Sequence, residues 1–109
     1  MVITHGYGAG QGTFYRMIAP LSHSNYKVHL FDHLGMGLSS RVPLPPKVEV
    51  NAVDAIDNAN ADREAELKDV EQVESYFVEA LEKWRAKSGI DKMVLASHSL
   101  GGYLAVIYA

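Results

Sequence analysis

The clearest candidate for chemistry is the segment Ser97-His98-Ser99-Leu100-Gly101-Gly102, which follows a short apolar run and precedes a helical pattern. A serine between a buried strand and a helix can occupy a sharp turn that pushes its hydroxyl out of the sheet, as in G-x-S-x-G nucleophiles. The residues two before and two after must be small so that strand and helix approach each other. Gly101 meets this requirement, and Ser97 replaces the usual first glycine. Ser99 is therefore the candidate nucleophile; the alternative is a helix cap with no chemistry.

A second segment, His5-Gly6-Tyr7-Gly8, follows the first apolar run. Gly6 and Gly8 let the chain turn, so that the Tyr7 amide can face a serine site. Together with the Leu100 amide at the start of the last helix, it would bind a developing oxyanion. The alternative is an ordinary strand-to-helix turn.

The same glycine-rich loop raises a different possibility. Glycines after a strand, with Asp32 ending the next strand about 20 residues later, resemble a dinucleotide-binding fingerprint. The spacing Gly8-x-Gly10-x-Gly12 departs from the required G-x-G-x-x-G, and a serine turn after the third strand has no role in such a site. We therefore favour the serine nucleophile site well above a dinucleotide-binding site.

Hydrophobic periodicity predicts the elements that would position these residues. The expected order is β-α-β-loop-α-β-α, which favours a parallel sheet in a three-layer α/β/α arrangement. The expected strands cover 2–4, 27–31 and 92–97, and the expected helices cover 13–21, 67–84 and 100–109. Thr13 is the expected N-cap of the first helix, and Gly89 is the expected C-cap of the second. Phe77 and Trp84 fall on the apolar stripe of the long helix and are expected in the core.

Residues 42–62 form a predicted mobile insert. Pro43, Pro45 and Pro46 disfavour regular structure, and the stretch from Asn51 to Asp62 has little to bury. The two ends of the sequence fall inside a strand-like and a helix-like pattern. We therefore expect residues 1–109 to be part of a larger domain, the alternative being a small complete one.

The composition is that of a globular protein and narrows the classes of function. Apolar residues make up 48% and charged residues 21% of the 109 residues, and the net charge of −3 argues against nucleic-acid binding. The absence of cysteine excludes disulfides and thiolate catalysis, and we expect no metal and no organic cofactor. No secretory leader is visible, so we expect a cytoplasmic protein.

These blocks, in this order, resemble the α/β-hydrolase superfamily. The stretches Val73–Arg85 and Gly89–Leu95 are similar to the branch of lysophospholipases, N-acyl-phospholipid lipases and the lipid-droplet lipase co-activator. The resemblance implies that Ser99 is the nucleophile, that Tyr7 and Leu100 donate to the oxyanion, and that Gly6, Gly8, Ser97 and Gly101 shape the two loops. It also implies a lipid or acyl-ester substrate and association with lipid droplets or peripheral membranes. The co-activator has asparagine where this chain has Ser99.

Family members place the catalytic acid and histidine after the serine, and none of the residues after Ser99 is Asp, Glu or His. We expect neither His98 nor His5, His23, His29 or His33 to act as an efficient base. The chain alone is therefore predicted to be inactive, with the lid and acyl pocket outside it. The other reading is a non-catalytic module that regulates a lipase or binds a lipid droplet.

Overall fold

The computed structural model describes residues 1–48 and 59–109 of the chain. Three strands, β1 (Val2–Thr4), β2 (His29–Phe31) and β3 (Leu95–Ser97), form one sheet in the order β2-β1-β3. Both pairings are parallel, and Val2 lies opposite His29 on one side and Leu95 on the other. The predicted parallel sheet is confirmed, and β1 is its central strand.

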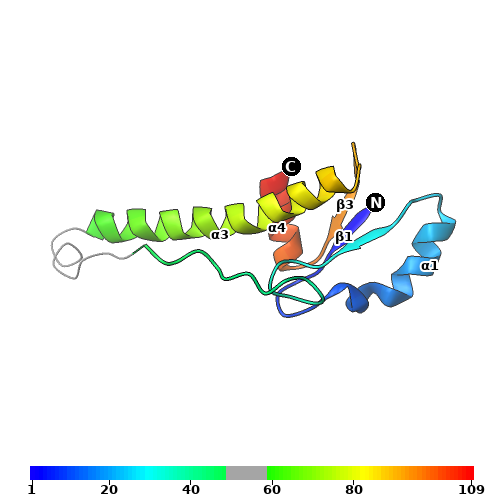
Figure 1. Ribbon diagram of the computed structural model, residues 1–109, viewed down its shortest axis with the longest axis horizontal. Helices are drawn as coiled ribbons and strands as arrows, with labels where there is room; N and C mark the ends of the chain where they lie inside the picture. Colours follow the sequence, from blue (N-terminus) through cyan, green and yellow to red (C-terminus); the bar gives the residue numbers. More distant parts are fainter. Residues whose placement is uncertain (49–58) are drawn as a thin grey trace.

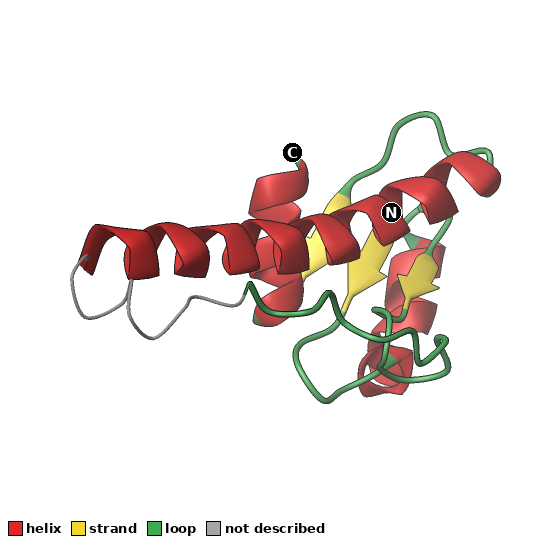
Figure 2. Ribbon diagram, turned by 60° about the vertical axis from the view of Figure 1, so that its left-hand side comes forward, coloured by secondary structure: helices red, strands yellow, loops and turns green. Residues whose placement is uncertain are grey.

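Helices cover both faces of this sheet (Figures 1 and 2). A 3-10 helix, η1 (Gln11–Phe14), leads into α1 (Tyr15–His23), and two further helices are α3 (Ala59–Lys87) and α4 (Leu100–Tyr108). On one face, Val2, Phe31 and Leu81 form a buried cluster against which Trp84 and Leu95 pack.

Ile3 points to the opposite face, because successive side chains of a strand alternate. It shares a cavity of about 310 Å³ with Phe14, Met17 and Leu21 from η1 and α1. The α/β/α layering predicted from the sequence is therefore confirmed.

The first helix differs from the expectation at its start. The chain enters η1 at Gln11, and Thr13 lies inside η1 instead of capping the helix, so the predicted Thr13 cap was wrong. The reason is a long-range bond: Asp32 Oδ1 accepts the Gln11 N–H at 2.5 Å. This carboxylate satisfies an amide at the start of η1, the role expected of a local cap.

The long helix α3 begins at Ala59 rather than near Leu67, and it ends as predicted. Gly89 has φ +66°, its N–H donates to Ala86 O, and the Ile90 N–H donates to Arg85 O. These two bonds form a Schellman motif and confirm the predicted C-cap.

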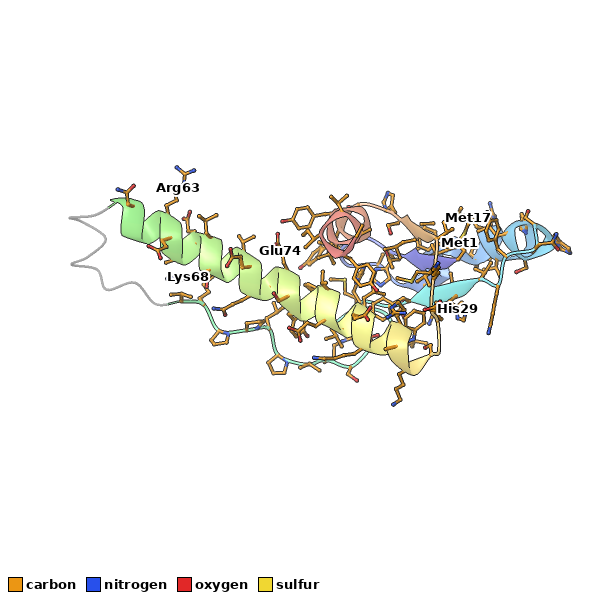
Figure 3. All side chains as sticks on the ribbon, turned by 90° about the horizontal axis from the view of Figure 1, so that it is seen from above. Met1, Met17, His29, Arg63, Lys68 and Glu74 are labelled. Atoms are coloured by element: carbon orange, nitrogen blue, oxygen red, sulfur yellow. The ribbon has the colours of Figure 1, made fainter. Side chains whose placement is uncertain are left out.

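Part of α3 projects beyond the sheet, as the positions of Arg63 and Lys68 show in Figure 3. Leu67 and Val70 in this part are 55% and 48% exposed, so this end of the predicted apolar stripe is not in the core. Closer to the sheet, Glu74 lies on the side of α3 that faces α4 and accepts a hydrogen bond from the Tyr103 hydroxyl (Figure 3).

The predicted insert at 42–62 falls into three parts. Residues 42–48 have no regular structure, as the prolines predict, and run beside α3. The Tyr76 hydroxyl donates to Val42 O at 2.8 Å, and the Val48 N–H donates to Asp69 Oδ1 at 2.6 Å. Residues 49–58 lie outside the described residues, and 59–62 belong to α3. The mobility of the insert remains a prediction.

Candidate functional site

Ser99 occupies the turn between β3 and α4. The strand ends at Ser97, the helix begins at Leu100, and Ser99 has φ +55° and ψ −122°. A residue with a Cβ rarely adopts a positive φ, and such backbone strain costs about 1–3 kcal/mol and concentrates at functional sites. The side chain of Ser99 is exposed to solvent. The predicted positions of strand, turn and helix are confirmed.

Two close approaches explain the small residues around this turn. A Cβ on Gly101 would come within 2.6 Å of the His5 carbonyl oxygen and of Thr4 Oγ1. A Cβ on Gly6 would come within 2.9 Å of Ser99 Cβ and 3.3 Å of Ser99 Oγ. The loop after β1 therefore lies against the turn after β3, because the two strands are paired neighbours. Glycine at both positions permits this contact.

Ser97, the residue that replaces the first glycine of the pattern, ends β3 opposite Thr4. The Thr4 hydroxyl donates to Ser97 Oγ at 2.9 Å, which ties the ends of β1 and β3 together. A serine at this position thus adds a bond that glycine would lack. Gly8, in the adjacent loop, has φ +68°, a conformation that glycine adopts without strain.

The two residues that carry the predicted oxyanion donors, Tyr7 and Leu100, both line one cavity of about 470 Å³. Leu100 is the first residue of α4, so its N–H has no acceptor within the helix. The positive end of the helix dipole lies at the same place. Convergence of these two amides on the Ser99 oxygen remains a prediction.

His5 is buried and holds the loop that carries Tyr7. Its Nδ1 lies 2.7 Å from Gly6 O, and its Nε2 lies 3.2 Å from the His33 backbone nitrogen. In this network Nδ1 faces the Gly6 carbonyl, which only accepts, and Nε2 accepts the His33 N–H. Both ring nitrogens are therefore engaged in positioning the backbone, which fits the expectation that His5 is not a catalytic base.

Asp32 braces the loop after β2. Its carboxylate accepts the Gln11 N–H, and it accepts the Leu38 N–H at 2.9 Å. Its backbone oxygen accepts the Ser39 hydroxyl at 2.5 Å. These bonds tie the loop after β2 to the start of η1.

The same bonds weigh against the dinucleotide reading. A carboxylate already occupied by Gln11 and Leu38 is not free to bind a ribose. The strand order also differs, since the dinucleotide fold places its third strand beyond the second, whereas β3 lies beside β1.

His33 was not distinguished from the other histidines by its sequence, and its environment is unusual. It is 1% exposed, and within residues 1–48 and 59–109 neither ring nitrogen has a hydrogen-bond partner. Its ring packs edge-on against those of His5, Phe31 and Phe77. Burial lowers the pKa of His33 from its ordinary value of 6.5 to about 4, and the charge of His5 acts in the same direction, while Asp32 opposes both.

The structure offers Ser99 no established base among residues 1–48 and 59–109. His98 Nδ1 would lie 3.3 Å from a Cβ added to Gly6, so its ring borders the loop after β1. Among the described residues, it makes no hydrogen bond to Ser99 Oγ. In the same ranges, no three His, Asp or Glu side chains are grouped so as to hold a metal ion.

A family model described as the alpha/beta hydrolase fold matches residues 1–109. The chain belongs to the α/β-hydrolase family. Curated relatives include the human 1-acylglycerol-3-phosphate O-acyltransferase ABHD5, which is 37% identical over 109 residues. They also include the bovine (Lyso)-N-acylphosphatidylethanolamine lipase, at 35% identity, and an Arabidopsis thaliana 1-acylglycerol-3-phosphate O-acyltransferase, at 32%.

Each alignment covers 100% of this chain, and the chain spans between a fifth and a quarter of the length of these relatives. No solved structure matches. The resemblance to lipid-related hydrolases is confirmed, and the fold that it implied agrees with the sheet described above.

Proposed function

We propose that this α/β-hydrolase chain carries the nucleophile and the oxyanion donors of an enzyme that cleaves or transfers an acyl group of a lipid. The observation that carries the proposal is the strained, exposed Ser99 between β3 and α4. The names of the relatives, which are acyltransferases and a lipase of phospholipid-type substrates, support an acyl-lipid substrate.

The reaction would begin with attack of Ser99 Oγ on the acyl carbonyl carbon. The carbonyl oxygen, which becomes negatively charged, would accept hydrogen bonds from the amides of Tyr7 and Leu100, and the N-terminus of α4 would stabilise the same charge. The serine proton must pass to a base. Since no described histidine is bonded to Ser99, we propose that this base and its acid partner come from outside residues 1–109.

A chimera tests this proposal, with this chain replacing the matching segment of the bovine (Lyso)-N-acylphosphatidylethanolamine lipase. A fluorophosphonate should label the chimera, and Ser99→Ala should abolish labelling and lipase activity. Ser22→Ala, an exposed serine on α1, is the matched control and should retain both. A correctly folded chimera without labelling would refute the catalytic proposal and favour the non-catalytic regulatory module.

We also propose that the protein acts at a lipid surface, such as a droplet or a peripheral membrane. Tyr7, Leu38 and Leu44 are 82%, 89% and 59% exposed and lie in segments that follow the carboxyl ends of β1 and β2. Apolar side chains exposed around a site favour contact with a lipid phase. No described helix is long and apolar enough to cross a bilayer. Loss of vesicle co-flotation in Leu38→Ser would support this surface role, and unchanged flotation would contradict it.

A further inference from the structure

The chain carries a proline-rich segment, Val42-Pro43-Leu44-Pro45-Pro46-Lys47, that the proposed reaction does not use. A proline fixes its own φ near about −65° and biases the residue before it towards extended backbone. Val42, Leu44 and Pro45 each precede a proline, so most of the segment is restricted to the polyproline II region. The structure agrees, since residues 42–48 form no helix or strand and none of them has a positive φ.

Exposure along this segment follows the repeat of a polyproline II helix, which has three residues per turn. Pro45 and Val48 are half-buried, three residues apart. The residues between them and before them are exposed, namely Pro43, Leu44, Pro46 and Lys47. Figure 1 shows the segment running beside α3. One face of the polyproline helix therefore lies against α3, and the other two face solvent.

The inward face of the segment is fixed to α3 at both ends. Val42 O accepts the Tyr76 hydroxyl at 2.8 Å, and the Val48 N–H donates to Asp69 Oδ1 at 2.6 Å. Between these anchors, Pro45 lines a groove of about 480 Å³ on the surface of α3. Among the described residues, no hydrogen bond reaches a carbonyl of residues 43–47. These carbonyl groups are thus available to the donors of a partner.

We propose that the outward faces of this segment are a docking site for a protein domain that recognises polyproline helices. Pro43 and Pro46 lie one helical turn apart, about 9 Å along the axis, and both are exposed. This is the P-x-x-P spacing that the aromatic-lined grooves of SH3, WW and EVH1 domains bind. The anchors on α3 already order the segment, which lowers the entropic cost of binding. The proposal does not depend on the chemistry of Ser99.

Lys47 adds a charge next to the second exposed proline. Its side chain is exposed, and none of the ion pairs within residues 1–48 and 59–109 includes it. An acidic side chain beside the partner's aromatic groove would bind this ammonium group and fix the direction in which the helix lies. Because such an exposed ion pair is screened by salt, binding should weaken as the ionic strength rises.

Surface plasmon resonance of the full chain against a panel of purified SH3, WW and EVH1 domains tests the proposal. At least one domain should bind. Replacing an outward proline by alanine removes two carbon atoms from the partner's groove, so Pro43→Ala and Pro46→Ala should each weaken binding about ten-fold. Pro45→Ala is the matched control, because Pro45 faces α3, and it should weaken binding less than about three-fold.

A second variant leaves the prolines in place. Lys47→Glu should keep the circular dichroism spectrum, weaken binding and remove its dependence on salt, and Ser99→Ala should bind like the wild type. No binding to any domain of the panel at about 1 mM would overturn the proposal. Equal losses in Pro45→Ala and Pro46→Ala would also overturn it. So would a loss of vesicle co-flotation in Pro46→Ala without any domain bound, since the segment would then contact lipid.

Discussion

Acid should unfold this protein through His33. The pKa of the buried ring is about 4, below its ordinary value of 6.5, so the unfolded chain takes up the proton more readily than the folded one. The stability linked to neutral His33 is therefore present above about pH 6.5 and is lost as the pH falls towards 4. The full shift corresponds to about 3 kcal/mol, of which about 2 kcal/mol should disappear between pH 7 and pH 5.

Urea unfolding of wild type and His33→Leu, followed by circular dichroism at pH 7 and pH 5, measures this effect. Leucine cannot be protonated. Between pH 7 and pH 5, the His33→Leu variant should therefore lose about 2 kcal/mol less of its free energy of unfolding than the wild type does. His5 and Asp32, the titratable groups next to His33, are present in both proteins, and their contributions largely cancel. His23→Gln, which changes an exposed histidine, should behave like the wild type. Equal losses in wild type and His33→Leu would refute the reasoning.

Three further predictions concern the turns and the catalytic proposal. Because glycine tolerates the positive φ of residue 99, the free energy of unfolding of Ser99→Gly should exceed that of Ser99→Ala by about 1 kcal/mol. A lower urea midpoint for Ser99→Gly would contradict the proposed backbone strain. Gly37→Ala combines φ +51° with a Cβ that would collide with the Asp32 carboxylate, and it should cost about 1–3 kcal/mol in the same assay. Gly12→Ala has open space around the new Cβ and should cost far less. The 109-residue chain alone should hydrolyse a short chromogenic ester no faster than its Ser99→Ala variant, and Ser99-dependent turnover would show that it contains a base.

Features that depend on neighbouring residues could be predicted from the sequence. The turn at Ser99 needs only a short apolar run, small flanking residues and a following helix, all within about ten positions. The C-cap at Gly89 could also be predicted from nearby residues, because a Schellman motif is a local arrangement of backbone hydrogen bonds. The order of strands and helices followed from periodicity in the same way.

Features that depend on distant partners could not be predicted. The cap of η1 comes from Asp32, and nothing near Gln11 in the sequence indicates it. The His33 nitrogens lack hydrogen-bond partners in the described part of the chain because of the rings that surround His33 in three dimensions. The early start of α3 at Ala59 was missed because Ala, Asn and Asp suggest a loop when no tertiary contact is known. The spacing of Pro43 and Pro46 was the available signal for the exposed polyproline face, but which face lies against α3 depends on Tyr76 and Asp69.

The central position of β1 sets an order for assembly of the molecule. Val2 pairs with His29 across a segment that contains η1 and α1, and with Leu95 across a segment more than three times longer. Closure entropy grows as (3/2)RT ln n, so the second pairing costs about 1 kcal/mol more before any contact offsets it. Synthesis from the N-terminus also delivers β3 last. The β1–β2 pair should therefore form first on the folding pathway, and the backbone strain at Ser99 is imposed only when β3 docks onto a sheet already half built.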